Sequence, residues 1–237
     1  MANNIGKLFY KDYYKGINFL DVIGEKKEVK ISDINNRIRQ SLLVQIDSPI
    51  KEKDGLQSFK LKVQYPGLIT GVGLVHDSKG IEGGYNLGMH FDYTMGMPII
   101  YGSTVKGVLS SYFKTFCEEE EAKLDDLYNQ IFEGKKGDKN ISIYERDVFF
   151  DAVIVNPKTG FLEDDSITPH TSGPLKNPIP ITMLKIAPGT TIEFRFRLKD
   201  SDDYTVDSKL KIFKEILTTV GIGAKTNVGY GQLTSID

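Results

Sequence analysis

The chain has 237 residues with 40% hydrophobic content, which is enough to bury the core of one elaborated domain or two small ones, and its single cysteine excludes an internal disulfide. Its net charge of −2 argues against a free-standing nucleic-acid-binding protein, because such proteins usually carry a basic excess. No apolar run approaches the length of a membrane span and the N-terminus is polar, so we expect a cytoplasmic protein with no membrane partner.

The first part of the chain contains one clear strand between less regular segments. Residues 1–40 are polar and are expected to form an N-terminal arm or extension, followed by a single domain over residues 41–237. The aromatic residues of the arm, which we expect to dock on another surface, are Tyr10, Tyr13, Tyr14 and Phe19. Alternating apolar residues over Gln57–Tyr65 predict a strand that ends at Pro66-Gly67. Frequent glycines over residues 67–98 then predict a long loop insertion.

The segment PIIYGSTVKGVLSSYFKTF, residues 98–116, predicts the first long helix. Its apolar residues have helical spacing over residues 103–116, and Ser103 or Thr104 is expected to be the N-cap. Exposed N–H groups at a helix start favour an anion, and Lys106 lies in the first turn. We therefore expect these three polar residues to contact a phosphate.

The rest of the chain alternates between strands and helices. Residues 141–155 are strongly strand-like, whereas proline and glycine interrupt residues 164–180 and predict a loop within a second insertion over about 156–180. The other expected elements are a helix over 121–132, a turn over 134–140, strands over 181–187 and 190–198, a helix over 207–220 and a strand over 229–236. The resulting order matches an α+β, ferredoxin-like (RRM-like) fold, with an antiparallel sheet, two helices on one face and large loop insertions.

The most informative stretch is GIGAKTNVGYG, residues 221–231, which connects the last helix to the last strand. Its four glycines allow positive φ values and let another backbone approach closely, and clustered N–H groups in such a loop can form an anion site. The loop residues that we expect to contact a nucleic-acid backbone are Gly221, Gly223, Lys225, Thr226, Asn227, Gly229, Tyr230 and Gly231. The alternative is a tight helix-to-strand connection in which Gly221 is the C′ residue of the helix.

A nucleotide-binding P-loop is not favoured, although GAKT resembles the end of a Walker A motif. Ala224 stands where that motif requires a glycine before the lysine. A P-loop also runs from strand to helix, and here a helix precedes the loop and a strand follows it. We therefore expect no nucleotide and no other cofactor.

Four motifs together resemble a known family: PIIYGSTVKGVL, VFFDAVIV (148–155), SITPHTS (166–172) and GIGAKTNVGYG. The chain resembles the RAMP superfamily of CRISPR-associated proteins, most of all the sixth-subunit group of type III-B (Cmr) effector complexes. The resemblance implies a non-catalytic RNA-binding subunit that contacts the guide RNA backbone near its 3′ end, in defence against foreign nucleic acid. The implied partners are the CRISPR guide RNA and its target duplex, other Cmr-type RAMP subunits and the small helical subunit. Two departures are Tyr101, where the family often has proline, and Ser110, where many members carry a basic residue.

Two other functions stay open. A RAMP-type endoribonuclease that processes CRISPR RNA would use histidine-centred acid/base cleavage, for which His90 and His170 are the candidates. The alternative role for each is a loop histidine that hydrogen-bonds the backbone or touches RNA, and we include His170 among the expected RNA contacts. A pure assembly module would instead bind sister subunits through the acidic segment 118–126 and the N-terminal arm. Because no acid/base pair or metal-ligand set has a recognisable spacing, we expect neither a catalytic residue nor a metal site.

Overall fold

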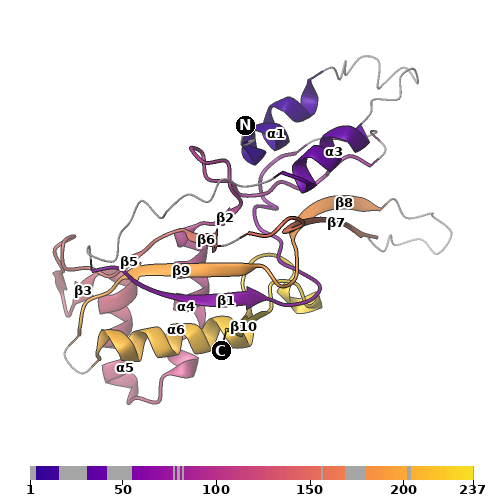
Figure 1. Ribbon diagram of the computed structural model, residues 1–237. Helices are drawn as coiled ribbons and strands as arrows, with labels where there is room; N and C mark the ends of the chain where they lie inside the picture. Colours follow the sequence, from indigo (N-terminus) through magenta and orange to yellow (C-terminus); the bar gives the residue numbers. More distant parts are fainter. Residues whose placement is uncertain are drawn as a thin grey trace, which may run out of the picture.

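The computed structural model describes residues 4–15, 31–41, 55–76, 78, 81, 83–155, 157–168, 180–201 and 204–236. These segments form a mixed structure of helices and antiparallel sheet (Figure 1). The helices are α1 (Ile5–Tyr10), α3 (Ile31–Arg39), α4 (Gly102–Phe116), α5 (Glu121–Tyr128) and α6 (Val206–Val220), with the short helical turns η1 (Asp12–Tyr14), η3 (Asn129–Glu133) and η4 (Thr226–Val228). The strands are β1 (Gln57–Val63), β2 (Ile99–Ile100), β3 (Lys135–Lys136), β4 (Lys139–Asn140), β5 (Val148–Phe149), β6 (Ala152–Val155), β7 (Leu162–Ile167), β8 (Ile181–Ile186), β9 (Thr191–Arg197) and β10 (Leu233–Ser235).

The main sheet is antiparallel and has the strand order β10-β1-β9-β6-β2, with β5 also paired to β9. Leu61 of β1 lies opposite Ser235 on one side and Ile192 on the other. The prediction that the strands near residues 57–65 and 229–236 share one sheet is therefore confirmed. Along β1, buried Leu61 and Val63 alternate with exposed lysines, which is the pattern of a strand with one buried face.

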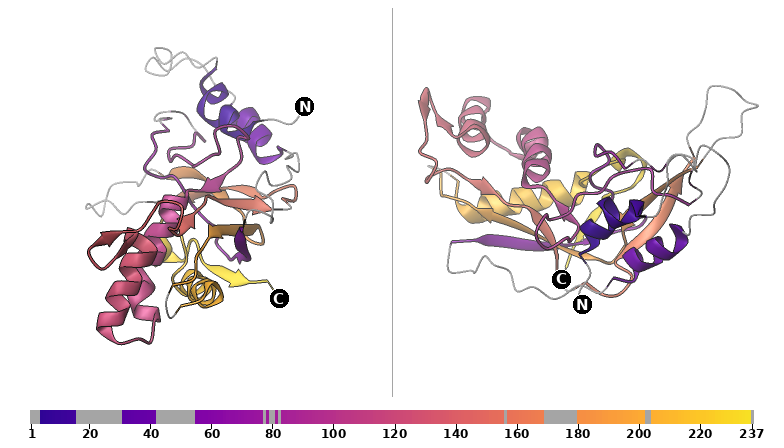
Figure 2. Two further views of the ribbon diagram at one scale, coloured as in Figure 1. Left: turned by 90° about the vertical axis from the view of Figure 1, so that its left-hand side faces the viewer. Right: turned by 90° about the horizontal axis from the view of Figure 1, so that it is seen from above.

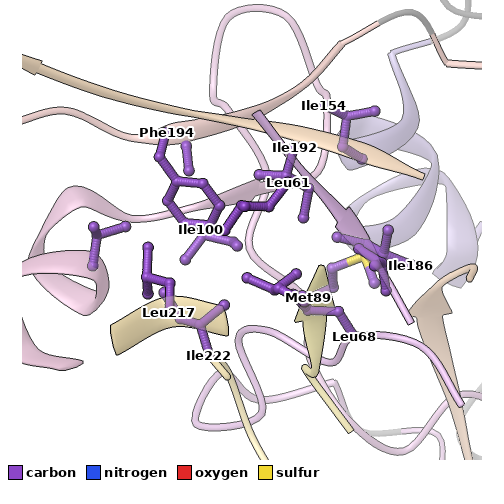
Figure 3. Close-up of a cluster of buried hydrophobic side chains, with 14 of the residues drawn as sticks. Leu61, Leu68, Met89, Ile100, Ile154, Ile186, Ile192, Phe194, Leu217 and Ile222 are labelled. Atoms are coloured by element: carbon purple, nitrogen blue, oxygen red, sulfur yellow. The ribbon is translucent and has the colours of Figure 1, made fainter. Parts of the chain in front are cut away.

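Helices α4 and α6 pack on the same face of this sheet, with α5 next to them, as the left view of Figure 2 shows. Val105, Leu109 and Phe113 of α4 are buried and recur every four residues, so they form one apolar stripe. Leu217 of α6 and Ile222 beyond it lie below sheet residues such as Leu61 and Phe194 in the core (Figure 3). Within the described segments, none of the helices is both long enough and apolar enough to cross a membrane.

The expected strand over residues 141–155 is wrong for its first half. Residues 141–147 form a turn in which the N–H of Glu145 donates to the carbonyl of Ser142 and Arg146 Nε donates to the carbonyl of Ile141. Only β5 and β6 pair with the sheet, and residues 150 and 151 separate them. The strand-forming composition of this segment is thus overridden by local hydrogen bonds and by the position of Asp151, described below.

The expected loop over residues 164–180 is wrong at its start, because β7 continues to Ile167. This strand pairs with β8 in a two-stranded hairpin, where Asp164 lies opposite Leu184 and Asp165 opposite Met183. Residues 169–179 lie outside the described residues. The acidic residues Asp164 and Asp165 are extended because β8, which follows the proline-rich segment in sequence, pairs with them.

The N-terminal residues pack on the opposite side of the molecule from α4–α6, next to the glycine-rich insertion (Figure 1). Tyr10 Oη donates to the carbonyl of Met89 at 2.7 Å, and the N–H of Tyr85 donates to Tyr13 Oη at 2.9 Å. The surface on which Tyr10 and Tyr13 dock is therefore the chain's own residues 67–98, where Tyr13 is buried and Tyr10 is partly buried. Phe19 lies outside the described residues.

Candidate nucleic-acid interface

The glycines of the 221–231 loop allow close contact between segments of this chain. A Cβ atom on Gly231 would lie 1.9 Å from the carbonyl oxygen of Ile222, and one on Gly223 would lie 2.4 Å from the carbonyl oxygen of Ile69. Both residues have positive φ, which side-chain-bearing residues rarely adopt. At Gly223 and Gly231 the backbone that the missing side chain admits is therefore the protein's own, whereas a Cβ at Gly229 would meet only Pro66 Cδ, at 3.7 Å.

Lys225 is the loop residue best placed to meet a ligand. It is exposed, and it is the one non-glycine residue with a positive φ (61°) in the described part of the chain. Its side chain makes no hydrogen bond or ion pair with another described residue. The turn around it is closed by two N–H groups, those of Val228 and Tyr230, which donate to the carbonyl of Lys225. Thr226 and Asn227 form the short turn η4, where Asn227 is exposed.

Tyr230 anchors this loop to the β7–β8 hairpin. Its hydroxyl donates to Asp165 Oδ2 at 2.9 Å, and Lys185 Nζ donates to the same oxygen at 2.8 Å. Burial and the nearby carboxylate raise the pKa of Tyr230 to about 12. Burial alone would raise the pKa of Asp165, but the hydrogen bonds from Lys185 and Tyr230 outweigh that effect and leave it below its ordinary value. The hydroxyl of Tyr230 is therefore committed to the hairpin.

The start of α4 differs from the prediction. The helix begins at Gly102, its N-cap is Tyr101 without a side-chain hydrogen bond, and neither Ser103 nor Thr104 caps it. The N–H of Gly102 instead donates to Asp151 Oδ1 at 2.7 Å. Gly102 is packed so closely that a Cβ would lie 2.3 Å from the carbonyl oxygen of Phe149. The first anion at this helix start is thus a carboxylate of the chain, which stabilises the positive end of the helix.

Of the polar residues expected near the helix start, Ser103 is exposed, and Thr104 and Lys106 are half-buried. Lys106 makes no hydrogen bond or ion pair with another described residue. These side chains remain accessible to a ligand, but any phosphate would share the helix start with Asp151. The family-like segments 98–109 and 148–155 therefore meet at one point in space, although some 40 residues of chain separate them.

His90 lies beside this helix start. Its Nδ1 is 3.0 Å from Thr70 Oγ1, and its ring stacks on Tyr101 with a centroid distance of 4.0 Å. Burial lowers the pKa of His90 below its ordinary value, and the carboxylate of Asp151 opposes that shift only in part. The lowered pKa favours the neutral form of this half-buried ring. His170, the other catalytic candidate and expected RNA contact, lies outside the described residues.

Residues 68–71 connect the two candidate regions. The carbonyl of Ile69 accepts a hydrogen bond from the N–H of Ala224 in the glycine-rich loop. The next residue, Thr70, contacts His90 beside the start of α4. Gly71 then passes so close to the 89–90 backbone that a Cβ would lie 2.4 Å from the nitrogen of His90. A short segment thus fixes the glycine-rich loop relative to the helix start.

Two residues of the site were missed by the sequence reasoning. Asp151 belongs to the VFFDAVIV motif, but its motif membership did not reveal that it holds the start of α4. Asp165 lay in a segment expected to be a loop, and its contact with Tyr230 joins residues 65 positions apart. Within the described segments, no group of three His, Cys, Asp or Glu side chains is arranged to hold a metal ion.

The chain is similar to proteins of a known family. Residues 60–234 match the family model of the RAMP superfamily. A curated relative, the CRISPR system CMR subunit Cmr6 of Saccharolobus solfataricus, is 28% identical over 159 residues, which are 65% of this chain and 51% of that protein. The chain thus spans about half the length of this relative.

A chain in the cryo-EM structure of the type III-B Cmr-beta bound to cognate target RNA has the same fold, with a TM-score of 0.62 and 21% identity. The match covers 100% of this chain and 87% of the other. The similarity to the sixth-subunit group that the motifs predicted is confirmed by the curated relative. Because the family model covers more than half of the sequence, including both the α4 start and the glycine-rich loop, the chain belongs to the RAMP superfamily.

Proposed function

We propose that this protein is an RNA-binding subunit of a type III-B CRISPR effector complex, which contacts the guide RNA backbone near its 3′ end and neighbouring RAMP subunits. The observation that carries the proposal is the exposed Lys225, which has no hydrogen-bond or ion-pair partner among the described residues and lies on a loop that is fixed from both sides. The names of the curated relative and of the complex with the same fold support the choice of assembly. The proposal includes target RNA and the small helical subunit as partners, and a cytoplasmic location.

The fold proposed for this function is a ferredoxin-like core preceded by an N-terminal extension. Taking β1, α4, β6, β9, α6 and β10 as a βαββαβ unit, the spatial strand order β10-β1-β9-β6 corresponds to 4-1-3-2. The two helices on one face support the same assignment. In this arrangement the α6–β10 connection and the start of α4 both lie at ends of the sheet, where loops are free to meet a ligand.

Replacing Lys225 by asparagine is expected to weaken RNA binding severalfold and to reduce the salt dependence of the binding constant by about one unit of slope. Asparagine tolerates the left-handed backbone of this position, so the loop geometry is retained while the charge is lost. The measurement is titration of single-stranded RNA over a salt series, with circular dichroism to confirm folding. The matched control is Lys211→Asn, because Lys211 is exposed on α6. An unchanged slope in Lys225→Asn would rule out a phosphate contact at this residue.

We further propose that the chain does not cleave RNA, and we expect labelled repeat RNA to stay intact during incubation with the purified protein, with or without divalent metal. The reason is that His90 is half-buried and already engaged with Thr70 and Tyr101, while the nearby carboxylate of Asp151 accepts a hydrogen bond from the N–H of Gly102 and makes none with His90. Gel analysis of the RNA is the measurement. Cleavage that disappears in a His90→Ala or His170→Ala variant would establish the endoribonuclease alternative. Complete absence of RNA binding would instead favour the assembly module.

A further inference from the structure

Tyr65 is a large aromatic residue that the fold holds in solvent. The residue is 84% exposed and lies two positions after the end of β1. The backbone on either side is fixed, because the N–H of Gln64 donates to the carbonyl of Gln232 at 2.9 Å and the N–H of Gly231 donates to the carbonyl of Gly67 at 2.8 Å. The ring is thus presented from a fixed position on the sheet.

Tyr65 lies beside the Lys225 turn. Pro66 Cδ would be 3.7 Å from a Cβ at Gly229, so the two segments run so close together that one added methyl group would touch both. The phenol of Tyr65 is also close enough to Tyr230 to contribute to the raised pKa of that residue. Val228, between Lys225 and Gly229, is 63% exposed. An exposed tyrosine, an exposed valine and an exposed lysine without a partner among the described residues therefore lie on two adjacent segments, residues 65–66 and 225–229, which we call the knob.

Packing within the chain does not account for this tyrosine. Tyr13, Tyr85 and Tyr230 bury their rings and hydrogen-bond their hydroxyls to other residues. Tyr65 does neither with any described residue. A single exposed apolar residue needs no explanation. Here three groups that can bind a ligand occur together: the aromatic ring of Tyr65, the apolar side chain of Val228 and the ammonium group of Lys225. The cation also occupies a strained backbone conformation, which is a feature of functional sites.

We propose that Tyr65 stacks on an unpaired RNA base while Lys225 binds a phosphate of the same strand. Single-stranded RNA offers both chemistries side by side, since each base is joined through one sugar to its phosphate. An apolar peptide could pack on the ring of Tyr65 and on Val228. It would offer no anion to Lys225, which has no acidic neighbour in the knob. The inference rests on the proposed RNA-binding function and names the nucleotide contact at its site.

The experiment uses the full chain and two strands of equal length, an oligouridine RNA and the corresponding abasic ribose-phosphate strand. Tyr65→Ala is expected to weaken binding of the oligouridine by about 5- to 150-fold, the range for loss of one base–aromatic stack, with an unchanged salt slope. Binding of the abasic strand, which has phosphates but no bases, is expected to stay as in the wild type. The control is Tyr144→Ala, because Tyr144 is 75% exposed in the segment between β4 and β5, at the other end of the sheet (Figure 1).

A second variant reports the stack directly. The sequence contains no tryptophan, so Tyr65→Trp introduces a single fluorophore that can still stack. Its fluorescence is expected to be quenched by the oligouridine and to change little with the abasic strand. The inference would be overturned if Tyr65→Ala bound the oligouridine with wild-type affinity and the fluorescence of Tyr65→Trp were not quenched. The proposed function would then still stand. Loss of binding to a partner subunit without loss of RNA affinity would assign Tyr65 to a protein interface instead. A wild-type chain that binds neither strand would overturn both.

Discussion

Replacing Lys209 by alanine is expected to lower the free energy of unfolding by about 3–5 kcal/mol, because it leaves a buried carboxylate without its counter-charge. The Lys209 side chain is 2% exposed and that of Asp147 is 3% exposed, and Lys209 Nζ lies 2.7 Å from Asp147 Oδ2. The same ammonium group also donates to the carbonyl of Lys199 at 2.7 Å. This ion pair connects the first turn of α6 to the residue before β5.

Urea denaturation monitored by circular dichroism measures this effect. Lys211→Ala is the matched control, since Lys211 lies on the exposed side of the same helix and should change stability by less than about 0.5 kcal/mol. The double variant Lys209→Met with Asp147→Asn should recover part of the loss, because it removes the uncompensated charge and keeps an acceptor for the N–H of Lys199. A Lys209→Ala variant within about 1 kcal/mol of the wild type would contradict the buried-pair interpretation.

Gly231→Ala is expected to destabilise the protein by about 2–5 kcal/mol, through backbone strain of about 1–3 kcal/mol and overpacking of similar size. The φ of Gly231 is 73°, and the new methyl group would lie 1.9 Å from the carbonyl oxygen of Ile222. That carbonyl belongs to backbone inside the loop, so it has no free space into which to move. The measurement is again urea denaturation, compared with the wild type.

Gly73→Ala is the control for this second experiment, because a Cβ at Gly73 meets no atom within 4 Å and its φ is not positive. Equal stability of Gly231→Ala and Gly73→Ala would mean that the loop does not need its glycine there. Gly223→Asp, which brings a side chain to within 2.4 Å of the Ile69 carbonyl oxygen, is expected to disturb the fold as well. Loss of RNA binding in such a glycine variant therefore does not identify a phosphate contact, whereas Lys225→Asn does.

The positions of most helices and strands could be predicted from the sequence, because they depend on local periodicity. The helix expected over residues 207–220 is found at Val206–Val220, and the strands expected over 181–187 and 190–198 are found at Ile181–Ile186 and Thr191–Arg197. Apolar residues repeat along these segments with the period of the element they form, and flanking prolines and glycines mark their ends. The prediction was wrong for the first half of segment 141–155. Its composition favours a strand, but hydrogen bonds at Ser142 and Arg146 impose a turn.

For the candidate site, the sequence by itself determined that a glycine-rich loop with one lysine follows the last helix, and that its motifs belong to the RAMP superfamily. Only the tertiary structure decided which backbone Gly223 and Gly231 face, which carboxylate holds the start of α4, and which exposed aromatic residue lies next to the Lys225 turn. Each of these depends on the proximity of residues far apart in the chain, such as Asp151 to Gly102 and Pro66 to Gly229. Local residue patterns specify φ, ψ and periodicity, but such pairings are set by how the sheet brings its ends together, which no local pattern encodes.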